Sequence, residues 1–136
     1  MKEIAAYLNF NGNCREVMTF YAKCLGAELQ LIPFSDMPGD HPPGTKDRIM
    51  HARLSKGPAS VLMASDTMQG MSAQQGNNIS IAIQCDSLAE IDVLFDALGE
   101  TGTVTMPLAD APWGARFGML TDQFGVHWMF NCELPK

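Results

Sequence analysis

One order of secondary-structure elements occurs twice in this chain of 136 residues. Apolar alternation, helical spacing of apolar residues and turn residues predict strand, helix, strand, strand and strand in each half. A shift of 73 residues places the segment 23–28 (KCLGAE) on the segment 96–101 (DALGET). A twofold repeat of five elements constrains the fold more than any one of those elements does. We therefore expect an α+β fold made of two βαβββ modules.

Local signals delimit the elements of each half. Asn13 is a candidate cap for the first helix and Gly26 a natural stop. In the second helix Ser87 is the cap, Glu90 stands in capping-box position and Gly99 is the stop. The predicted helices are 14–26 and 87–99, and the predicted strands are 3–10, 27–34, 48–55, 59–66, 78–85, 100–108, 115–121 and 126–132.

The two modules are expected at about 1–66 and about 77–136. The connector between them, 67–76, is polar and has no periodicity, and the segment 35–47 is predicted as a loop because it holds three prolines and two glycines. The length of the chain is that of one ordinary domain. Each helix is expected to cover one face of a curved mixed sheet, so that the other face lines a shared cleft.

Composition limits the class of partner. Nine lysines and arginines against fifteen acidic residues give a formal net charge of −6, which argues against nucleic acid or an anionic membrane as the main partner. No apolar run approaches the roughly 18 residues of a membrane span, and no N-terminal run is typical of a signal peptide. We expect a cytoplasmic protein whose four cysteines, none spaced as CxxC, are reduced.

Strand phase predicts which side chains line the cleft. Alternate residues of a strand point to opposite faces, and the more apolar phase of each strand is assigned to its helix. That phase includes Ile4, Met50, Ile79, Trp128 and Phe130. A slip by one residue would bury polar groups under a helix, at about 1–3 kcal/mol for each unsatisfied group. The residues predicted on the cleft side are Tyr7, Asn9, His51, Arg53, Asn78, His127 and Met129.

Several polar residues have two interpretations. His51 is a general base or ligand anchor, or a half-buried histidine bonded to a neighbouring strand. Arg53 clamps a carboxylate or phosphate, or is a surface arginine paired with an acid. His127 joins His51 in a two-histidine metal site, or is simply a polar residue on the cleft side. Asp66 and Asp122 are expected to be turn residues, with Asp122 accepting backbone N–H bonds.

Two long segments carry a family resemblance. YLNFNGNCREVMTFYAKCLGAEL (7–29) and PWGARFGMLTDQFGVHWMFN (112–131) resemble the vicinal oxygen chelate superfamily of glyoxalases, extradiol dioxygenases and bleomycin-resistance proteins, and within it the PhnB-like, or 3-demethylubiquinone methyltransferase-like, branch. The resemblance covers essentially the whole chain and implies the glyoxalase/bleomycin-resistance-like fold and a homodimer. It also implies that Trp113 and Arg116 lie at the mouth of the cleft, as a stacking wall with a cation or as a structural hairpin plug.

The resemblance also implies where a metal would bind. In metal-dependent relatives each module gives one ligand from its first strand and one from its last, and none of the side chains at those places here is a good ligand for a catalytic divalent metal. No Gly-rich loop follows an early strand, so S-adenosylmethionine binding is not indicated. We expect no metal and no cofactor. The four places fall at about Ala5, Met63, Asn78 and Met129, and a slip by one residue leads to Ala6 or Leu62.

Two hypotheses for function follow from these observations. The first is a metal-free protein that binds a small, partly apolar molecule in the cleft, with an anion favoured by Arg53. The second is an enzyme of lyase, isomerase or dioxygenase type that acts on a small molecule through His51 or through a metal at a relocated site. The sequence identifies no ligand, because fold alone does not determine function.

Overall fold

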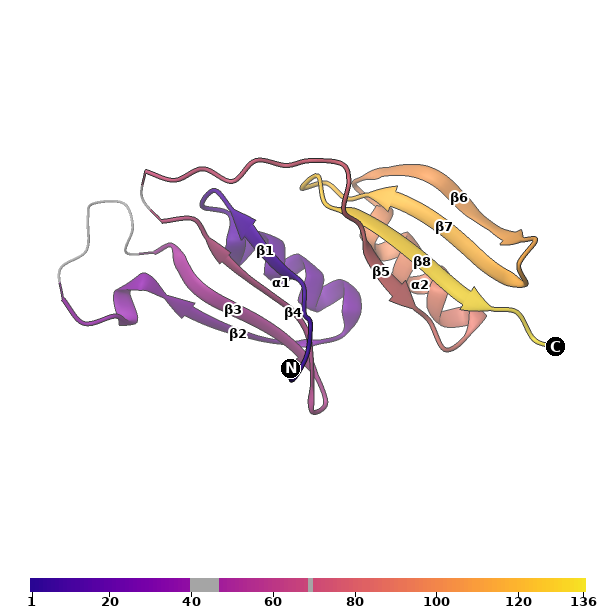
Figure 1. Cartoon of the computed structure of the whole chain (residues 1–136), viewed down its shortest axis with the longest axis horizontal. Coiled ribbons are helices and arrows are strands. Elements are labelled where there is room, and N and C mark those ends of the chain that lie inside the picture. The colour runs from indigo at the N-terminus through magenta and orange to yellow at the C-terminus, as the bar shows by residue number, and fades with distance from the viewer. Residues whose placement is uncertain (40–46, 69) are drawn as a thin grey trace. The chain divides into compact units, whose positions relative to one another are not determined.

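The computed structural model describes residues 1–39, 47–68 and 70–136, so most of the predicted loop 35–47 and one residue of the connector lie outside the described residues. Two compact units, Met1–Gln74 (unit 1) and Gln75–Lys136 (unit 2), make up the chain. The elements are β1 (Tyr7–Phe10), α1 (Cys14–Leu25), β2 (Glu28–Pro33), the short 3₁₀ helix η1 (Phe34–Asp36), β3 (Ile49–Lys56) and β4 (Ala59–Asp66) in unit 1, and β5 (Ile81–Gln84), α2 (Leu88–Gly99), β6 (Thr103–Ala111), β7 (Ala115–Thr121) and β8 (His127–Glu133) in unit 2 (Figure 1).

Each unit contains one four-stranded mixed sheet, and the two sheets have the same topology. The strand order is β1-β4-β3-β2 in unit 1 and β5-β8-β7-β6 in unit 2. The first strand of each unit pairs in parallel with the last, and the other neighbours are antiparallel. One helix lies against one face of each sheet (Figure 1). The predicted α+β fold of two βαβββ modules is therefore confirmed.

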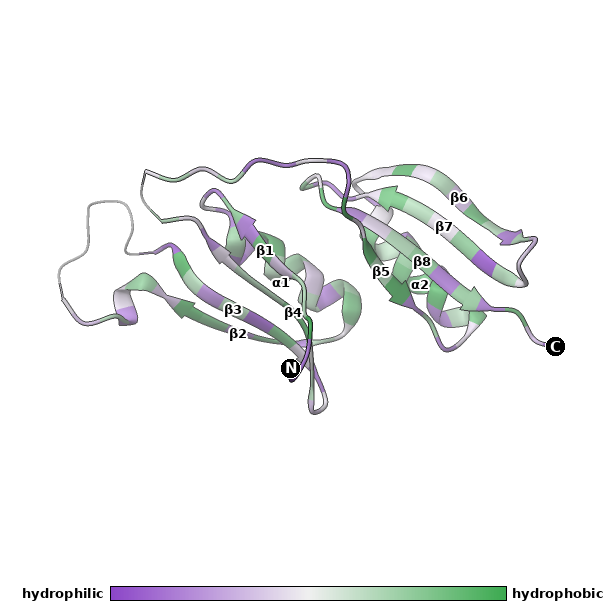
Figure 2. Ribbon diagram, viewed as in Figure 1, coloured by the Kyte–Doolittle hydropathy of each residue, from purple (hydrophilic) through white to green (hydrophobic). Residues whose placement is uncertain are grey.

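The core of unit 1 forms where the apolar phase of the strands meets α1. Polar and apolar residues alternate along β3, as Figure 2 shows. Because successive strand residues point to opposite faces, all the apolar residues of one phase can pack on the helix. The side chains that are fully or almost fully buried there are Val17, Met18 and Tyr21 of α1, Ala52 and Leu54 of β3, and Leu62 and Ala64 of β4.

A buried carboxylate, rather than the predicted Asn13, caps α1. Asn13 occupies the N-cap position, but its side chain makes no capping hydrogen bond. Asp66 at the end of β4 is 3% exposed, and its Oδ1 accepts from the backbone N–H groups of Gly12 and Cys14, both at 2.9 Å. Its Oδ2 accepts from the N–H of Ile49 at 2.8 Å. One side chain therefore joins the start of α1, the start of β3 and the end of β4.

The core of unit 2 combines aromatic side chains with a glycine that leaves room for them. Phe95 of α2 and Phe130 of β8 form an edge-to-face pair with ring centroids 5.2 Å apart, and Gly118 of β7 is paired with Phe130. A Cβ added at Gly118 would lie 2.9 Å from Cε2 of Phe95 and 2.8 Å from Cδ2 of Leu108. Glycine at this position lets α2 approach the sheet closely. Trp128 and Cys132 are buried on the same face as Phe130.

The first strand of each unit is shorter than predicted. β1 begins at Tyr7 and β5 at Ile81, and the two isoleucines assigned to the helix side, Ile4 and Ile79, are 87% and 77% exposed. Both residues precede the pairs that their strands make with β4 and β8. The error arises because alternation reports the side-chain pattern, but not where pairing with a neighbouring strand begins.

Two predicted boundaries in unit 2 also differ. β6 runs to Ala111, beyond the predicted strand end at residue 108, so only a short turn separates it from β7. Gly99 is the last residue of α2 and Glu100 occupies the C-cap position in a right-handed helical conformation, whereas Gly26 does end α1 in the left-handed conformation. Ser87 accepts from the N–H of Glu90 at 3.0 Å, which confirms the predicted cap. Within the described ranges, neither helix has the length and apolar character that crossing a bilayer requires.

Side-chain hydrogen bonds anchor the last residues of the connector, one of them within unit 1 and one within unit 2. Asn11 donates through Nδ2 to the carbonyl of Ala73 at 3.0 Å, and its Oδ1 accepts from the N–H of Ala73 at 2.8 Å. Gln75 donates through Nε2 to the carbonyl of Phe124 at 2.7 Å. Ala73 is therefore held by bonds within unit 1, and Gln75 by a bond within unit 2.

Candidate functional site

The candidate site is the face of the unit 1 sheet opposite α1. Buried residues of β3 and β4 point to the helix, so the alternate residues form the other face. Strand register brings Arg53 beside Met63 of β4 and Gln30 of β2, and brings His51 beside Ile32. We call this surface open face 1, and its residues include Tyr7, Asn9, Glu28, Gln30, Ile32, His51, Arg53, Ser55, Met63 and Ser65.

Tyr7 and His51 form a direct pair on open face 1. The Tyr7 hydroxyl lies 3.0 Å from Nδ1 of His51. The two rings are stacked, with centroids 5.7 Å apart and planes inclined by 29°. Within the described part of the chain, Nε2 of His51 makes no further hydrogen bond. The tautomer of His51 decides the direction of the Tyr7 bond, and when the phenol donates, Nε2 carries the hydrogen and is a donor.

Open face 1 combines this pair with apolar and cationic groups. Tyr7 is 43% exposed, and Met63 is its register partner and also that of Arg53. Four of the predicted cleft residues, Tyr7, Asn9, His51 and Arg53, thus share one sheet face in unit 1. Gln30 and Ile32 also lie on this face, and the apolar alternation of Leu29 and Leu31 in β2 is the sequence signal that would have placed them there.

His127 serves as an anchor in unit 2. Its Nδ1 lies 2.9 Å from Oγ1 of Thr121, and its Nε2 lies 3.2 Å from the carbonyl oxygen of Gly76. A carbonyl only accepts, so Nε2 carries the hydrogen and Nδ1 accepts from the threonine hydroxyl. A metal bound through either nitrogen would remove one of these bonds. The geometry therefore favours the polar, structural interpretation of His127 over the two-histidine metal site.

The other predicted residues of unit 2 occupy separate places. Met129 pairs with Ala82 and Met119 on the sheet face opposite α2. Asn78 is exposed and precedes β5. Trp113 lies in the turn between β6 and β7, is 65% exposed, and meets Phe117 edge to face at a centroid distance of 5.5 Å.

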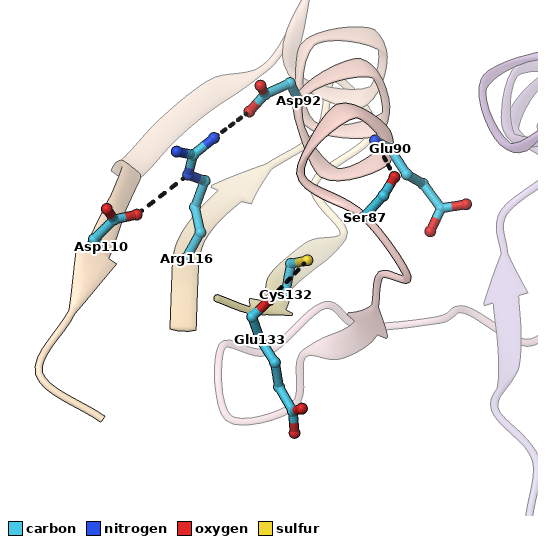
Figure 3. Close-up of polar contacts among 7 residues, drawn as sticks. All are labelled: Ser87, Glu90, Asp92, Asp110, Arg116, Cys132 and Glu133. Atoms are coloured by element: carbon cyan, nitrogen blue, oxygen red, sulfur yellow. Dashed lines mark hydrogen bonds and ion pairs between the residues drawn. The ribbon is translucent and has the colours of Figure 1, made fainter. Parts of the chain in front are cut away.

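Arg116 lies on the helix-covered face of unit 2, and its place at the mouth of a cleft stays a prediction. Its register partner is Cys132, whose side chain is buried on that face. Figure 3 shows the guanidinium between two carboxylates: Nη1 lies 3.4 Å from Oδ1 of Asp92 in α2, and Nε lies 3.3 Å from Oδ1 of Asp110 in β6. The expectation followed the family resemblance, whereas the phase of β7 would have assigned Arg116 to the helix side.

Asp122 has a structural role like that of Asp66. It is 4% exposed, and its Oδ1 accepts from the N–H groups of Phe124 at 2.9 Å and Val126 at 3.0 Å. Its Oδ2 accepts from the indole N–H of Trp128 at 2.9 Å. The prediction that Asp122 accepts backbone N–H bonds is confirmed. Across the described residues, no group of three or more His, Cys, Asp or Glu side chains is placed to hold a metal ion.

Comparison with known proteins gives full-length matches. The crystal structure of protein PA1353 from Pseudomonas aeruginosa is 47% identical, with a TM-score of 0.87 over 99% of this chain and 100% of that one. The PhnB protein from Bacillus cereus is 27% identical, with a TM-score of 0.76 over 96% and 99% of the two chains. A glyoxalase/bleomycin resistance protein/dioxygenase family enzyme from Burkholderia phytofirmans PsJN is 14% identical and shares the fold, with a TM-score of 0.64 over 95% and 98%.

The sequence also matches a family model. The model described as 3-demethylubiquinone-9 3-methyltransferase matches residues 2–130, which includes both units almost entirely. The fold described above agrees with that of the glyoxalase/bleomycin-resistance neighbours. The chain therefore belongs to the PhnB-like 3-demethylubiquinone-9 3-methyltransferase family and has the glyoxalase/bleomycin-resistance fold.

Proposed function

We propose that the protein binds a small, partly apolar anion on open face 1. The observation that carries the proposal is the stacked and hydrogen-bonded Tyr7–His51 pair on the same sheet face as Arg53. A guanidinium binds carboxylates and phosphates through two parallel hydrogen bonds. Stacked rings offer a flat apolar surface with polar edges.

The apolar part of the ligand would lie against Tyr7, Met63 and Ile32. Covering apolar surface contributes roughly 25 cal/mol for each Å² removed from water, and Tyr7 has 43% of its surface to contribute. Methionine adapts to ligands of different shape because its side chain is unbranched and flexible. This combination favours an anion with an aromatic or branched aliphatic body over a sugar or a cation. A cleft shared with Asn78, Trp113 and Met129 of unit 2, contact with Arg116, and a homodimer stay predictions.

Binding is tested with a thermal-shift screen of small carboxylates and phosphates, since a ligand of the native state raises the melting temperature. Each hit is then titrated by calorimetry against Arg53→Met, Tyr7→Phe and His51→Ala. We expect Arg53→Met to weaken an anionic hit by about tenfold to a hundredfold, the loss of one charge-assisted contact.

Arg15→Met is the matched control, because Arg15 lies exposed on α1, on the other side of the sheet. It should leave the affinity unchanged, and each variant should keep the circular dichroism spectrum of the parent protein. An anionic hit that binds Arg53→Met as tightly as the parent protein would place its binding site away from open face 1.

The second candidate function is an enzyme that uses His51 or a relocated metal site. The 3.0 Å contact between the Tyr7 hydroxyl and His51 Nδ1 favours an acid–base version, because these two groups are within proton-transfer distance. The metal-dependent version is tested with a chelator. We expect the chelator to leave the melting temperature unchanged, because no cluster of ligands among the described residues links a metal to the fold.

The chelator experiment is read by differential scanning fluorimetry beside metal analysis of protein purified without added metal. A fall of several degrees on chelation that one specific metal restores, or a stoichiometric content of zinc, nickel, manganese or iron, would support the metal-dependent enzyme instead.

A further inference from the structure

Two cysteines of unit 2 directly follow the last residue pair of the parallel strands β5 and β8. The last residue pair of these strands is Gln84 with Asn131. The N–H of Cys85 donates to the carbonyl of Asn131 at 2.8 Å, which is a bond of that last parallel pair, so Cys85 and Cys132 are the two residues that directly follow the pair. Neighbouring strands lie about 4.8 Å apart, which is within the roughly 4.4–6.8 Å between Cα atoms in disulfides.

Both thiols project to the same face of the sheet. Cys132 is buried in phase with Trp128 and Phe130, and Cys85 continues the phase of Ile81, which is paired with Trp128. Both are free thiols, and Cys85 is the more accessible of the two. Figure 3 shows Cys132 near the end of β8, with its Sγ 3.6 Å from the carbonyl oxygen of Glu133.

We propose that Cys85 and Cys132 are a reversible disulfide site that closes by exchange with a small-molecule disulfide. The Cys85 thiolate attacks one sulfur of the disulfide RSSR and displaces one RS⁻, which leaves a mixed disulfide on Cys85. The Cys132 thiolate then attacks the Cys85 sulfur and displaces the second RS⁻. The two displaced thiolates take up the two protons from the cysteines, so two cysteine thiols are oxidised while RSSR is reduced to two RSH.

Closure would join the end of β5, where the chain turns into α2, to the end of β8. Burial raises the pKa of Cys85 to about 11, with Glu90, Cys132 and Asp86 adding to the rise. Since only the thiolate attacks, closure is slow at neutral pH and accelerates as the pH rises towards that value. This inference is independent of ligand binding on open face 1, which lies in unit 1.

The test treats the whole chain with oxidised glutathione at pH 7, 8 and 9, quenches with acid, alkylates the free thiols and maps the peptides by mass spectrometry. We expect a link between the peptides of Cys85 and Cys132, formed about tenfold faster for each pH unit because the thiolate fraction rises in that proportion. Reducing agent should reverse the link.

Two variants make the result specific. Cys132→Ser should accumulate glutathione on Cys85, and Cys24→Ser should close at the parent rate. Three results would overturn the proposal: a parent protein that stops at the mixed disulfide, one that links Cys85 to a cysteine other than Cys132, and one that leaves Cys85 unmodified at pH 9 after the other thiols have reacted. Because the parent protein supplies the first readout, the test holds even where a variant folds poorly.

Discussion

Replacing Asp66 with alanine is expected to lower the free energy of unfolding by about 3–5 kcal/mol. The buried carboxylate accepts three backbone hydrogen bonds, from Gly12, Cys14 and Ile49. Hydrogen bonds to a charged group contribute about 1.5–3 kcal/mol each, and donors left buried without a partner add a further penalty. The measurement is urea unfolding at pH 7, followed by circular dichroism.

Two further substitutions make the Asp66 experiment specific. Asp66→Asn keeps the shape of the side chain but turns an amide donor towards an N–H group, so it should be destabilising as well. Asp36→Ala is the control, because Asp36 is exposed in the short helix η1 of the same unit. It should change stability by less than about 0.5 kcal/mol. A loss below 1 kcal/mol for Asp66→Ala would contradict the structural role given to this carboxylate.

The second large effect is expected at Asp122. Asp122→Ala removes the acceptor for the N–H groups of Phe124 and Val126 and for the indole of Trp128, and should lower the free energy of unfolding by about 3–4 kcal/mol. Trp128→Phe should be destabilising too, because it removes the indole donor and leaves a cavity in the core of unit 2.

A double-mutant cycle separates the Asp122–Trp128 bond from those other effects. The coupling energy between Asp122→Ala and Trp128→Phe should be about 1–2 kcal/mol, since both single variants remove the same bond. Asp96→Ala, at an exposed position of α2, is the control. Strictly additive effects of the two variants would show that the indole–carboxylate bond contributes nothing to stability.

Patterns along the chain predict the fold well because burial against one helix selects one phase of every strand. Trp128 and Phe130 were assigned to the helix side for this reason, and both are buried. The same reasoning places Tyr7 and its neighbours on open face 1. It fails where strand pairing stops, as at Ile79. It was not applied to Arg116, although the phase of β7 places that residue on the helix side, where it pairs with Asp92 of α2.

Contacts between residues distant in sequence were beyond prediction. Asp66 caps a helix that begins 52 residues earlier, and local rules for helix caps consider only the adjacent residue, Asn13. In the same way His127 is paired with the backbone of Gly76, 51 residues away. A polar residue on a strand therefore has the same sequence signature whether it binds a ligand or anchors a loop.

The anchored connector bears on how such a chain came to exist. Ala73 is bonded to Asn11, and Gln75 is bonded to the backbone of Phe124. Gln74 is therefore the one residue between the two anchored positions. Each half carries its own sheet, helix and helix cap. Two halves that each carry a complete sheet, helix and cap are the arrangement that duplication of one module and fusion of the copies would produce.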